Sequence, residues 1–199
     1  MQVGWVVGVG CEGIHWHDPA VGVTYKYFAA ASDEMAASTI DLPGGPDGAG
    51  TQPLPMPLPE IMERYGPDGL REFAKPRLRL AETGFSVVGT KNFDSTSDLA
   101  VVEGILSGVG FDDFLARPRT SQVVAERDGG DCLVLTISDE SRDVLAKAGA
   151  VELPEAARRW VELQGSGDPE SLTGLLHELA ELARGAQLRG ERLYCWTRL

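Results

Sequence analysis

The sequence predicts an α+β domain with a mixed or mainly antiparallel sheet, and three observations support this fold class. Strands come first, followed by a helical middle, a hairpin, further helices and a closing strand, instead of a regular alternation of strands and helices. The chain ends in a long amphipathic helix and a short strand. Its 199 residues are 43% hydrophobic and show no internal repeat, which suits one core. We therefore expect residues 1–199 to form a single domain.

The predicted C-terminal helix has a start signal, a buried face and a stop signal. Asp168 is expected to cap its first turn, and Pro169 suits the first helical position, where its missing N–H has no partner to lose. Gly190 is expected to end the helix, because glycine readily adopts the left-handed conformation found there. Leucine and alanine recur in between at three- and four-residue steps, as on a buried helix face: Leu172, Leu175, Leu176, Leu179, Ala183 and Ala186.

Residues 192–199 are expected to form the closing strand. Alternate side chains of a strand point to opposite faces, so Leu193 and Cys195 would share one face, and Tyr194 and Trp196 the other. Large aromatic side chains are seldom left in solvent. We therefore expect this strand to be interior or well covered, and its removal to unfold the protein.

The remaining elements are predicted from short apolar runs and from capping residues. In order, they are strands at 2–9 and 21–29, a short helix from Asp33 to about Ile40 capped by Ser32, a strand at 85–88, a helix over 98–106 capped by Ser97 and ended by Gly108, one turn at 111–116, a hairpin of 120–126 and 132–138, and helices beginning after Ser138 and at Leu153. The hairpin rests on residues 127–131, whose Asp-Gly-Gly-Asp sequence suits a tight reversal.

Residues 41–58 are rich in proline and glycine and carry almost no charge. We interpret them as a long flexible loop within the domain. Two roles stay open for this loop, a lid or partner-binding loop and a plain insertion.

The formal net charge of −12 limits the classes of partner that this chain is expected to bind. It disfavours nucleic acid, which needs a basic surface to displace counterions, and anionic membranes. It suits a basic protein partner, although acidity that only keeps the protein soluble is the plainer explanation.

Cysteine usage and hydropathy indicate the compartment. No apolar run is long enough to cross a bilayer, and the first residues lack the pattern of a signal peptide. Three cysteines are an odd number without the spacing of a disulfide framework. We therefore expect a reduced, cytoplasmic protein.

The sharpest cluster of potential metal ligands lies at residues 11–18. If this segment is extended, His15 and His17 point to one side, as two metal ligands would, and Asp18 follows them. We take His15, His17 and Asp18 as the candidate metal ligands. The alternative is a loop with two ordinary histidines, because zinc sites use three or four ligands in known spacings and Cys-x3-His-x-His-Asp matches none.

No catalytic residue and no cofactor are predicted. The spacing Gly8-x-Gly10-x-x-Gly13 has the letters of a dinucleotide-binding turn, but the residues that follow cannot begin the required helix. The chain has no Gly-x-Ser-x-Gly motif. Its cysteines lie in apolar sequence, which is typical of structural cysteines. Nothing in the spacing of four further carboxylates selects a catalytic pair: Asp94, Asp98, Asp112 and Asp113.

Four stretches resemble a set of uncharacterised bacterial proteins that end in a Leu-Tyr-Cys-Trp strand. These are residues 25–34 (Tyr-Lys-Tyr-Phe-Ala-Ala-Ala-Ser-Asp-Glu), 99–108, the Ala-Arg-Arg-Trp at 157–160, and 190–199. More distantly, the layout is similar to the YfbM-like family. The resemblance covers about half of the chain and implies a small α+β fold. It carries no known catalytic residues, and residues 11–18 and 41–58 lie outside it.

Three functions follow as hypotheses. The first is a protein-binding module that engages a basic partner, in the manner of a toxin-neutralising immunity protein; it rests on the acidity and on the absence of a catalytic signature. The second is a metal-dependent or small-molecule enzyme that uses residues 11–18. The third is a homo-oligomeric structural protein, a homodimer whose terminal strand pairs across a two-fold axis.

Overall fold

The structure is a computed structural model that describes residues 23–48, 63–64, 66, 79–80, 83–91 and 93–199. Its strands are β1 (Thr24–Ala30), β2 (Arg79–Leu80), β3 (Ser86–Thr90), β4 (Val123–Arg127), β5 (Cys132–Thr136) and β6 (Arg192–Arg198). They form one sheet in the order β2-β3-β1-β6-β5-β4, and every described pairing is antiparallel. With the helices below, this sheet confirms the predicted α+β class. The strand predicted at 2–9 lies outside the described residues.

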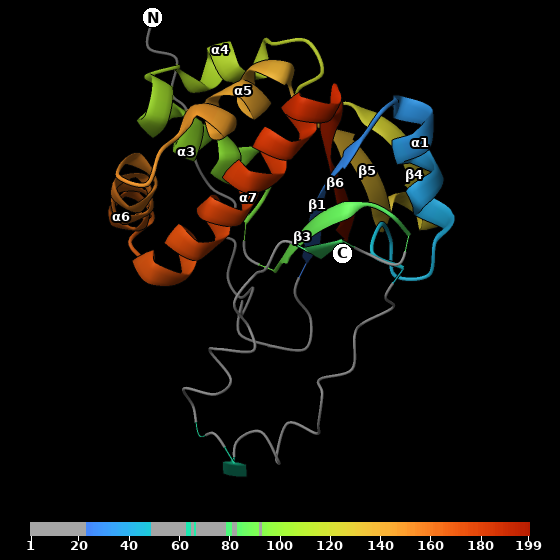
Figure 1. Ribbon diagram of the computed structural model, residues 1–199, viewed down its shortest axis with the longest axis horizontal. Helices are drawn as coiled ribbons and strands as arrows, with labels where there is room; N and C mark the ends of the chain where they lie inside the picture. Colours follow the sequence, from blue (N-terminus) through green and yellow to red (C-terminus); the bar gives the residue numbers. More distant parts are fainter. Residues whose placement is uncertain (1–22, 49–62, 65, 67–78, 81–82, 92) are drawn as a thin grey trace, which may run out of the picture.

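The helices divide between the two faces of the sheet (Figure 1). The larger layer, on one face, consists of α3 (Ser97–Ser107), α5 (Asp139–Lys147), α6 (Glu152–Gln164) and α7 (Pro169–Arg189), with the short α4 (Phe111–Leu115) beside it. The other face carries α1 (Asp33–Ala37) and the 3₁₀ turn η1 (Ser38–Asp41). A second 3₁₀ turn, η2 (Asp128–Gly130), joins β4 to β5 and completes the predicted hairpin. Among these helices, none is both long enough and apolar enough to pass through a bilayer.

The closing strand β6 lies in the middle of the sheet. It pairs with β1 along one edge and with β5 along the other, so that Cys195 stands opposite Tyr27 and Leu135. The prediction that this strand is interior is confirmed. Both edges of β6 are already used within the sheet, so in this fold β6 offers no free edge for the predicted pairing with a second copy.

Alternation along β6 separates two cores, as the strand pattern predicted. Leu193 and Cys195 belong to the core beneath the larger helical layer. Tyr194 and Trp196 belong to a smaller core, which includes Ala36 of α1 and Ile40 of η1. The central position of β6 explains why all four side chains are almost fully buried.

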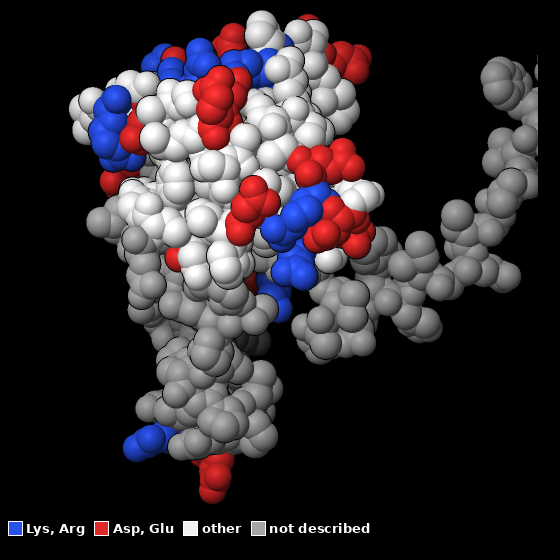
Figure 2. Space-filling view, turned by 90° about the vertical axis from the view of Figure 1, so that its right-hand side faces the viewer, with Lys and Arg blue, Asp and Glu red and all other residues white. Residues whose placement is uncertain are grey.

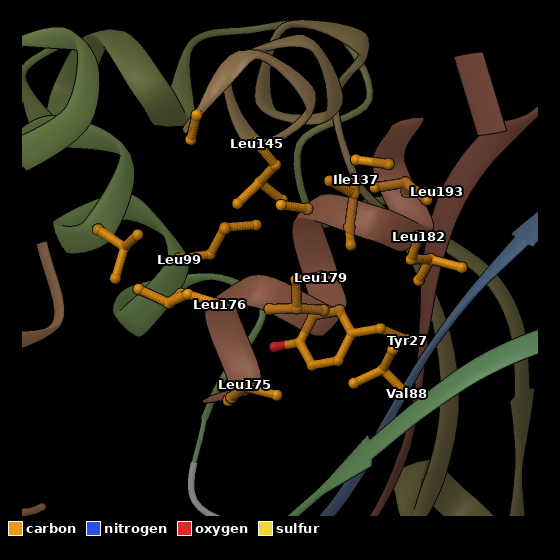
Figure 3. Packing of buried hydrophobic residues seen from close by; sticks show 14 of the residues in the cluster. Tyr27, Val88, Leu99, Ile137, Leu145, Leu175, Leu176, Leu179, Leu182 and Leu193 are labelled. Carbon is orange, nitrogen blue, oxygen red and sulfur yellow. The ribbon is translucent and has the colours of Figure 1, made fainter. Parts of the chain in front are cut away.

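Helix α7 lies between the sheet and the other helices of the larger layer, and it packs against both. Its leucines lie between sheet residues on one side and residues of α3 and α5 on the other (Figure 3). The residues of this contact include Tyr27, Val88, Leu99, Leu145, Leu175, Leu176, Leu179 and Leu182. Burying one leucine side chain stabilises a fold by about 1.5–3 kcal/mol, so this row contributes a large share of the stability.

The caps of the helices largely match the predictions. The Asp168 carboxylate accepts hydrogen bonds from the first-turn amides of α7, and Gly190 ends that helix at φ 68°. Ser32 caps α1, as predicted. The cap predicted for the helix near residue 97 is wrong: Ser97 is the first residue of α3, and Asp94 Oδ1 accepts from the amides of Thr96 and Ser97. A carboxylate two to three residues upstream reaches two free donors at once, which the serine cannot.

The first part of the predicted 41–58 loop is a series of turns packed on the sheet. Lys26 Nζ of β1 donates to Asp47 Oδ1 at 2.7 Å and to the Gly44 carbonyl. Gly45 lies against Trp196 of β6. Residues 42–48 therefore extend the cover that α1 and η1 provide, whereas residues 49–58 lie outside the described part of the chain.

Candidate functional site

The segment that includes α1 has an outer surface on which apolar and small side chains lie among two exposed carboxylates, Glu34 and Asp41. We define the α1 face as Ala31, Met35, Ser38, Leu42 and Pro43, which are exposed or half-buried on the outside of α1, η1 and the following turn. No lysine or arginine occurs between Lys26 and Arg64. Figure 2 views the molecule from this side: uncharged side chains make up much of the face, and acidic side chains also lie within it and at its edges.

Asp33, at the start of α1, is held by a pair of hydrogen bonds from Arg119. Arg119 Nη1 and Nη2 donate to Asp33 Oδ2 and Oδ1 at 2.9 and 2.8 Å, and the Tyr194 hydroxyl donates to Oδ1 at 2.7 Å. The hydrogen bonds from Arg119 and then from Tyr194 lower the pKa of Asp33 to about 2. Burial, followed by the hydrogen bond to Asp33, raises the pKa of the Tyr194 hydroxyl to about 12. Asp33 is therefore ionised, and Tyr194 neutral, across the physiological range.

The backbone at Arg119 and Ser121 is strained, and the guanidinium of Arg119 points toward Asp33 of α1. Arg119 has φ 66° and Ser121 has φ 50°, both in the left-handed region that side chains other than glycine seldom adopt. Each such residue costs about 1–3 kcal/mol. The Thr136 hydroxyl donates to the Arg119 carbonyl, and the Ser121 amide donates to the Thr136 carbonyl at 3.0 Å. The segment between α4 and β4 is thereby fixed so that Arg119 reaches α1.

A groove lies beside the α1 face. It has a volume of about 450 Å³, with apolar walls from Ala29, Met35 and Phe85, and it is also lined by Thr83 and by the Arg189–Glu191 ion pair at 2.8 Å. Clefts of this size accommodate a small molecule or a partner's side chain. Met35 is 47% exposed and lines this groove. The α1 face and the groove therefore form one continuous surface.

A different surface lies on the short helix α4. We define the α4 patch as Phe111, Asp112, Asp113 and Leu115. Phe111 is 50% exposed and Leu115 is 44% exposed, although Phe114 between them is buried. Asp112 and Asp113 are exposed, and among the described residues neither has an ion-pair partner. The patch thus combines an exposed aromatic ring with two uncompensated carboxylates.

The basic residue nearest to those carboxylates in the sequence belongs to a buried polar network. Arg117, the nearest cation in the sequence, donates instead to the Glu103 carboxylate, which is 2% exposed. Ser141 Oγ donates to the second oxygen of Glu103 at 2.6 Å. A buried carboxylate needs such partners, so Glu103 holds Arg117 and, through Ser141, ties α3 to α5.

The predicted metal ligands His15, His17 and Asp18 lie outside the described residues, as does Cys11. Within the described ranges, no three histidine, cysteine, aspartate or glutamate side chains gather as a metal site would require. The metal hypothesis therefore stays a prediction.

The cysteines and carboxylates that the structure does describe have structural surroundings. Cys132 and Cys195 are free and buried, and burial raises the pKa of the Cys195 thiol to about 12, which makes it a poor nucleophile. Asp94 and Asp98 do meet, because the Asp94 amide donates to Asp98 Oδ2 at 2.7 Å. They lie at the cap of α3, and burial raises the pKa of Asp98. His177 is partly buried on α7.

The contacts of Arg119 could not be found in the sequence. Asp33 is 86 positions from Arg119 and 161 from Tyr194, so no local spacing links them. The α4 patch did leave a signal in the sequence. Phe111 and Leu115 lie one turn apart in a helix of a single turn, which is too short to cover both side chains completely.

No protein-family model matches this chain, and comparisons with curated proteins and with solved structures find no match. The likeness to the YfbM-like family therefore remains a prediction from the sequence.

Proposed function

We propose that this protein is a protein-binding module that engages a basic partner, as an immunity protein engages its toxin. The observation that supports this proposal is the α4 patch, where exposed Phe111 and Leu115 are interleaved with Asp112 and Asp113. Aromatic residues are enriched among the side chains that carry most of the binding energy of an interface.

The two carboxylates supply what a basic partner would recognise. Because Arg117 is engaged with Glu103, Asp112 and Asp113 have no ion-pair partner within the part of the chain that the structure describes. Opposite charges at an interface speed association and select the correct partner more than they tighten binding. In this proposal the carboxylates guide the partner, and Phe111 and Leu115 provide the contact that retains it. The net charge of −12 also attracts a basic partner, over a longer range than the two carboxylates do.

Affinity capture from native lysate tests this function with three forms of the full chain. The wild type is expected to recover a basic protein that the double variant Asp112→Lys/Asp113→Lys does not recover. The matched control Glu140→Lys/Glu170→Lys makes the same change in net charge at exposed carboxylates of α5 and α7. If the control loses the protein as completely as the α4 variant does, the capture reflects net charge alone and the proposal is wrong.

A second variant separates contact from charge. Phe111→Ala leaves the charge unchanged but removes the aromatic ring, so its affinity for the recovered partner, measured by calorimetry, should fall at least about tenfold. An unchanged affinity would show that the partner binds elsewhere.

A further inference from the structure

Helix α4, which carries the α4 patch, is too short to hold its own shape. It has five residues, whereas isolated helices shorter than about 12–15 residues are marginal in water. Gly110 precedes it and has no side chain that could cap the first turn. The arrangement of Phe111 and Leu115 therefore depends on the contacts that α4 makes with the rest of the protein.

Arg117 joins the buried side of α4 to α3. Phe114 of α4 is 1% exposed, and the Arg117 guanidinium lies over its ring, with Cζ 5.9 Å from the ring centroid. The same guanidinium donates a hydrogen bond to Glu103 Oε1 of α3. The Thr120 hydroxyl donates to the Phe114 carbonyl at 3.1 Å, which fixes the end of α4 further.

Glu103 is itself held in place from α5. Ser141 Oγ donates to Glu103 Oε2 at 2.6 Å, and Ser138 Oγ lies 2.8 Å from Ser141 Oγ. All three side chains belong to residues that are 2% exposed or less. A buried ion pair often adds little net stability compared with apolar residues of the same size. Its effect here is geometric, because it gives Arg117 a fixed acceptor from which to reach α4.

We propose that Arg117 is a positioning residue, which, paired with Glu103, holds the α4 patch in the arrangement that a partner binds. This inference rests on the proposed function, in which the partner binds through that patch. A segment that is ordered before binding loses less conformational freedom when the complex forms, and its affinity is higher for that reason. Arg117 acts through α4 and does not need to contact the partner.

Amide hydrogen exchange of the full chain tests the position of α4 without a partner. The double variant Glu103→Gln/Arg117→Met removes the ion pair at unchanged net charge, and the glutamine can still accept from Ser141. The hydrogen-bonded amides of Phe114 and Ala116 should exchange at least about tenfold faster than in the wild type, whereas those of β6 should change much less. Unchanged exchange at α4, or acceleration by the same factor in β6, overturns the proposal.

Arg158→Met/Glu162→Gln is the matched control, because it removes an arginine–glutamate pair of α6 in which both side chains are more than half exposed. It should leave exchange at α4 unchanged. Once the wild type has recovered a basic partner, calorimetry should show that Glu103→Gln/Arg117→Met binds it at least about tenfold more weakly, and the control as tightly. Recovery of no partner overturns the proposed function, whereas a recovered partner that binds this variant as tightly as the wild type overturns only the positioning role of Arg117.

Discussion

Gly45 lies so close to the indole of Trp196 that a Cβ on Gly45 would stand 2.7 Å from Trp196 Cε2. Gly45 also has φ 86°, in the left-handed region. Both the contact and the conformation require glycine. This pair brings the 42–48 turns down onto the central strand and closes the smaller core.

Gly45→Ala should therefore lower the free energy of unfolding by about 2–4 kcal/mol, the sum of a left-handed penalty and an overpacked contact. Urea denaturation followed by tryptophan fluorescence measures the change. Gly89→Ala is the control, because a Cβ on Gly89 meets nothing within 4 Å and its backbone is extended. Equal stability of the Gly45 variant and the wild type would show that the turn does not rest on Trp196.

Deletion of residues 191–199 should leave the chain unfolded, because β6 is hydrogen-bonded on both edges and contributes to both cores. Circular dichroism and amide hydrogen exchange measure the loss. Deletion of Leu199 alone should be tolerated, since this residue is 69% exposed and follows the strand. A soluble truncated chain with a native spectrum would contradict the central role of β6.

Asp33 should make the free energy of unfolding depend on pH only in the acid range, below about pH 4. Its pKa is lowered from 3.8 to about 2 in the folded state, so the stabilisation is fully present above pH 4 and is lost as the pH falls toward 2. The stability difference between the wild type and Asp33→Asn should be constant near neutral pH, at about 1 kcal/mol after allowance for the solvent exposure of the pair. It should shrink below pH 4.

Denaturant unfolding at several pH values checks this window. Arg119→Gln should show the same acid dependence, and the double variant should cost less than the sum of the two single changes, because both remove one interaction. A difference that persists unchanged to pH 2 would show that Asp33 is not held by Arg119.

Glu103→Ala should cost about 3 kcal/mol of stability, because it leaves Arg117 and the buried Ser141 hydroxyl without their acceptor. Arg117 is 17% exposed and can turn toward solvent, which keeps the cost at the low end for a broken buried pair. Urea unfolding of the variant against the wild type measures it. A cost below about 1 kcal/mol would mean that the network contributes little net stability.

Cys195 should react with thiol reagents only when the whole domain unfolds. Its side chain is fully buried in the central strand, and burial raises the pKa of its thiol to about 12. Mass spectrometry of peptides after alkylation, with and without urea, follows its modification. Labelling of Cys195 at a rate that exceeds global unfolding would reveal local opening of the sheet.

The helices could be predicted well because their signals are local. The cap at Asp168, the stop at Gly190 and the leucine stripe all lie within one segment, and α7 follows them. The two faces of β6 were predicted for the same reason, since alternation depends only on neighbouring residues. The error at the start of α3 was also local: Asp94 competed with Ser97 for the same amides, and the carboxylate reaches two of them.

The sequence by itself determined the α+β class, the caps, the hairpin and the division of β6 into two apolar faces, because each depends on residues within a few positions of one another. Only the tertiary structure decided that β6 is a central strand, that Arg119 holds Asp33, and that Arg117 pairs with Glu103. These relationships join elements far apart in the chain. They depend on which edges and faces meet during packing, and no periodicity within one segment encodes that choice.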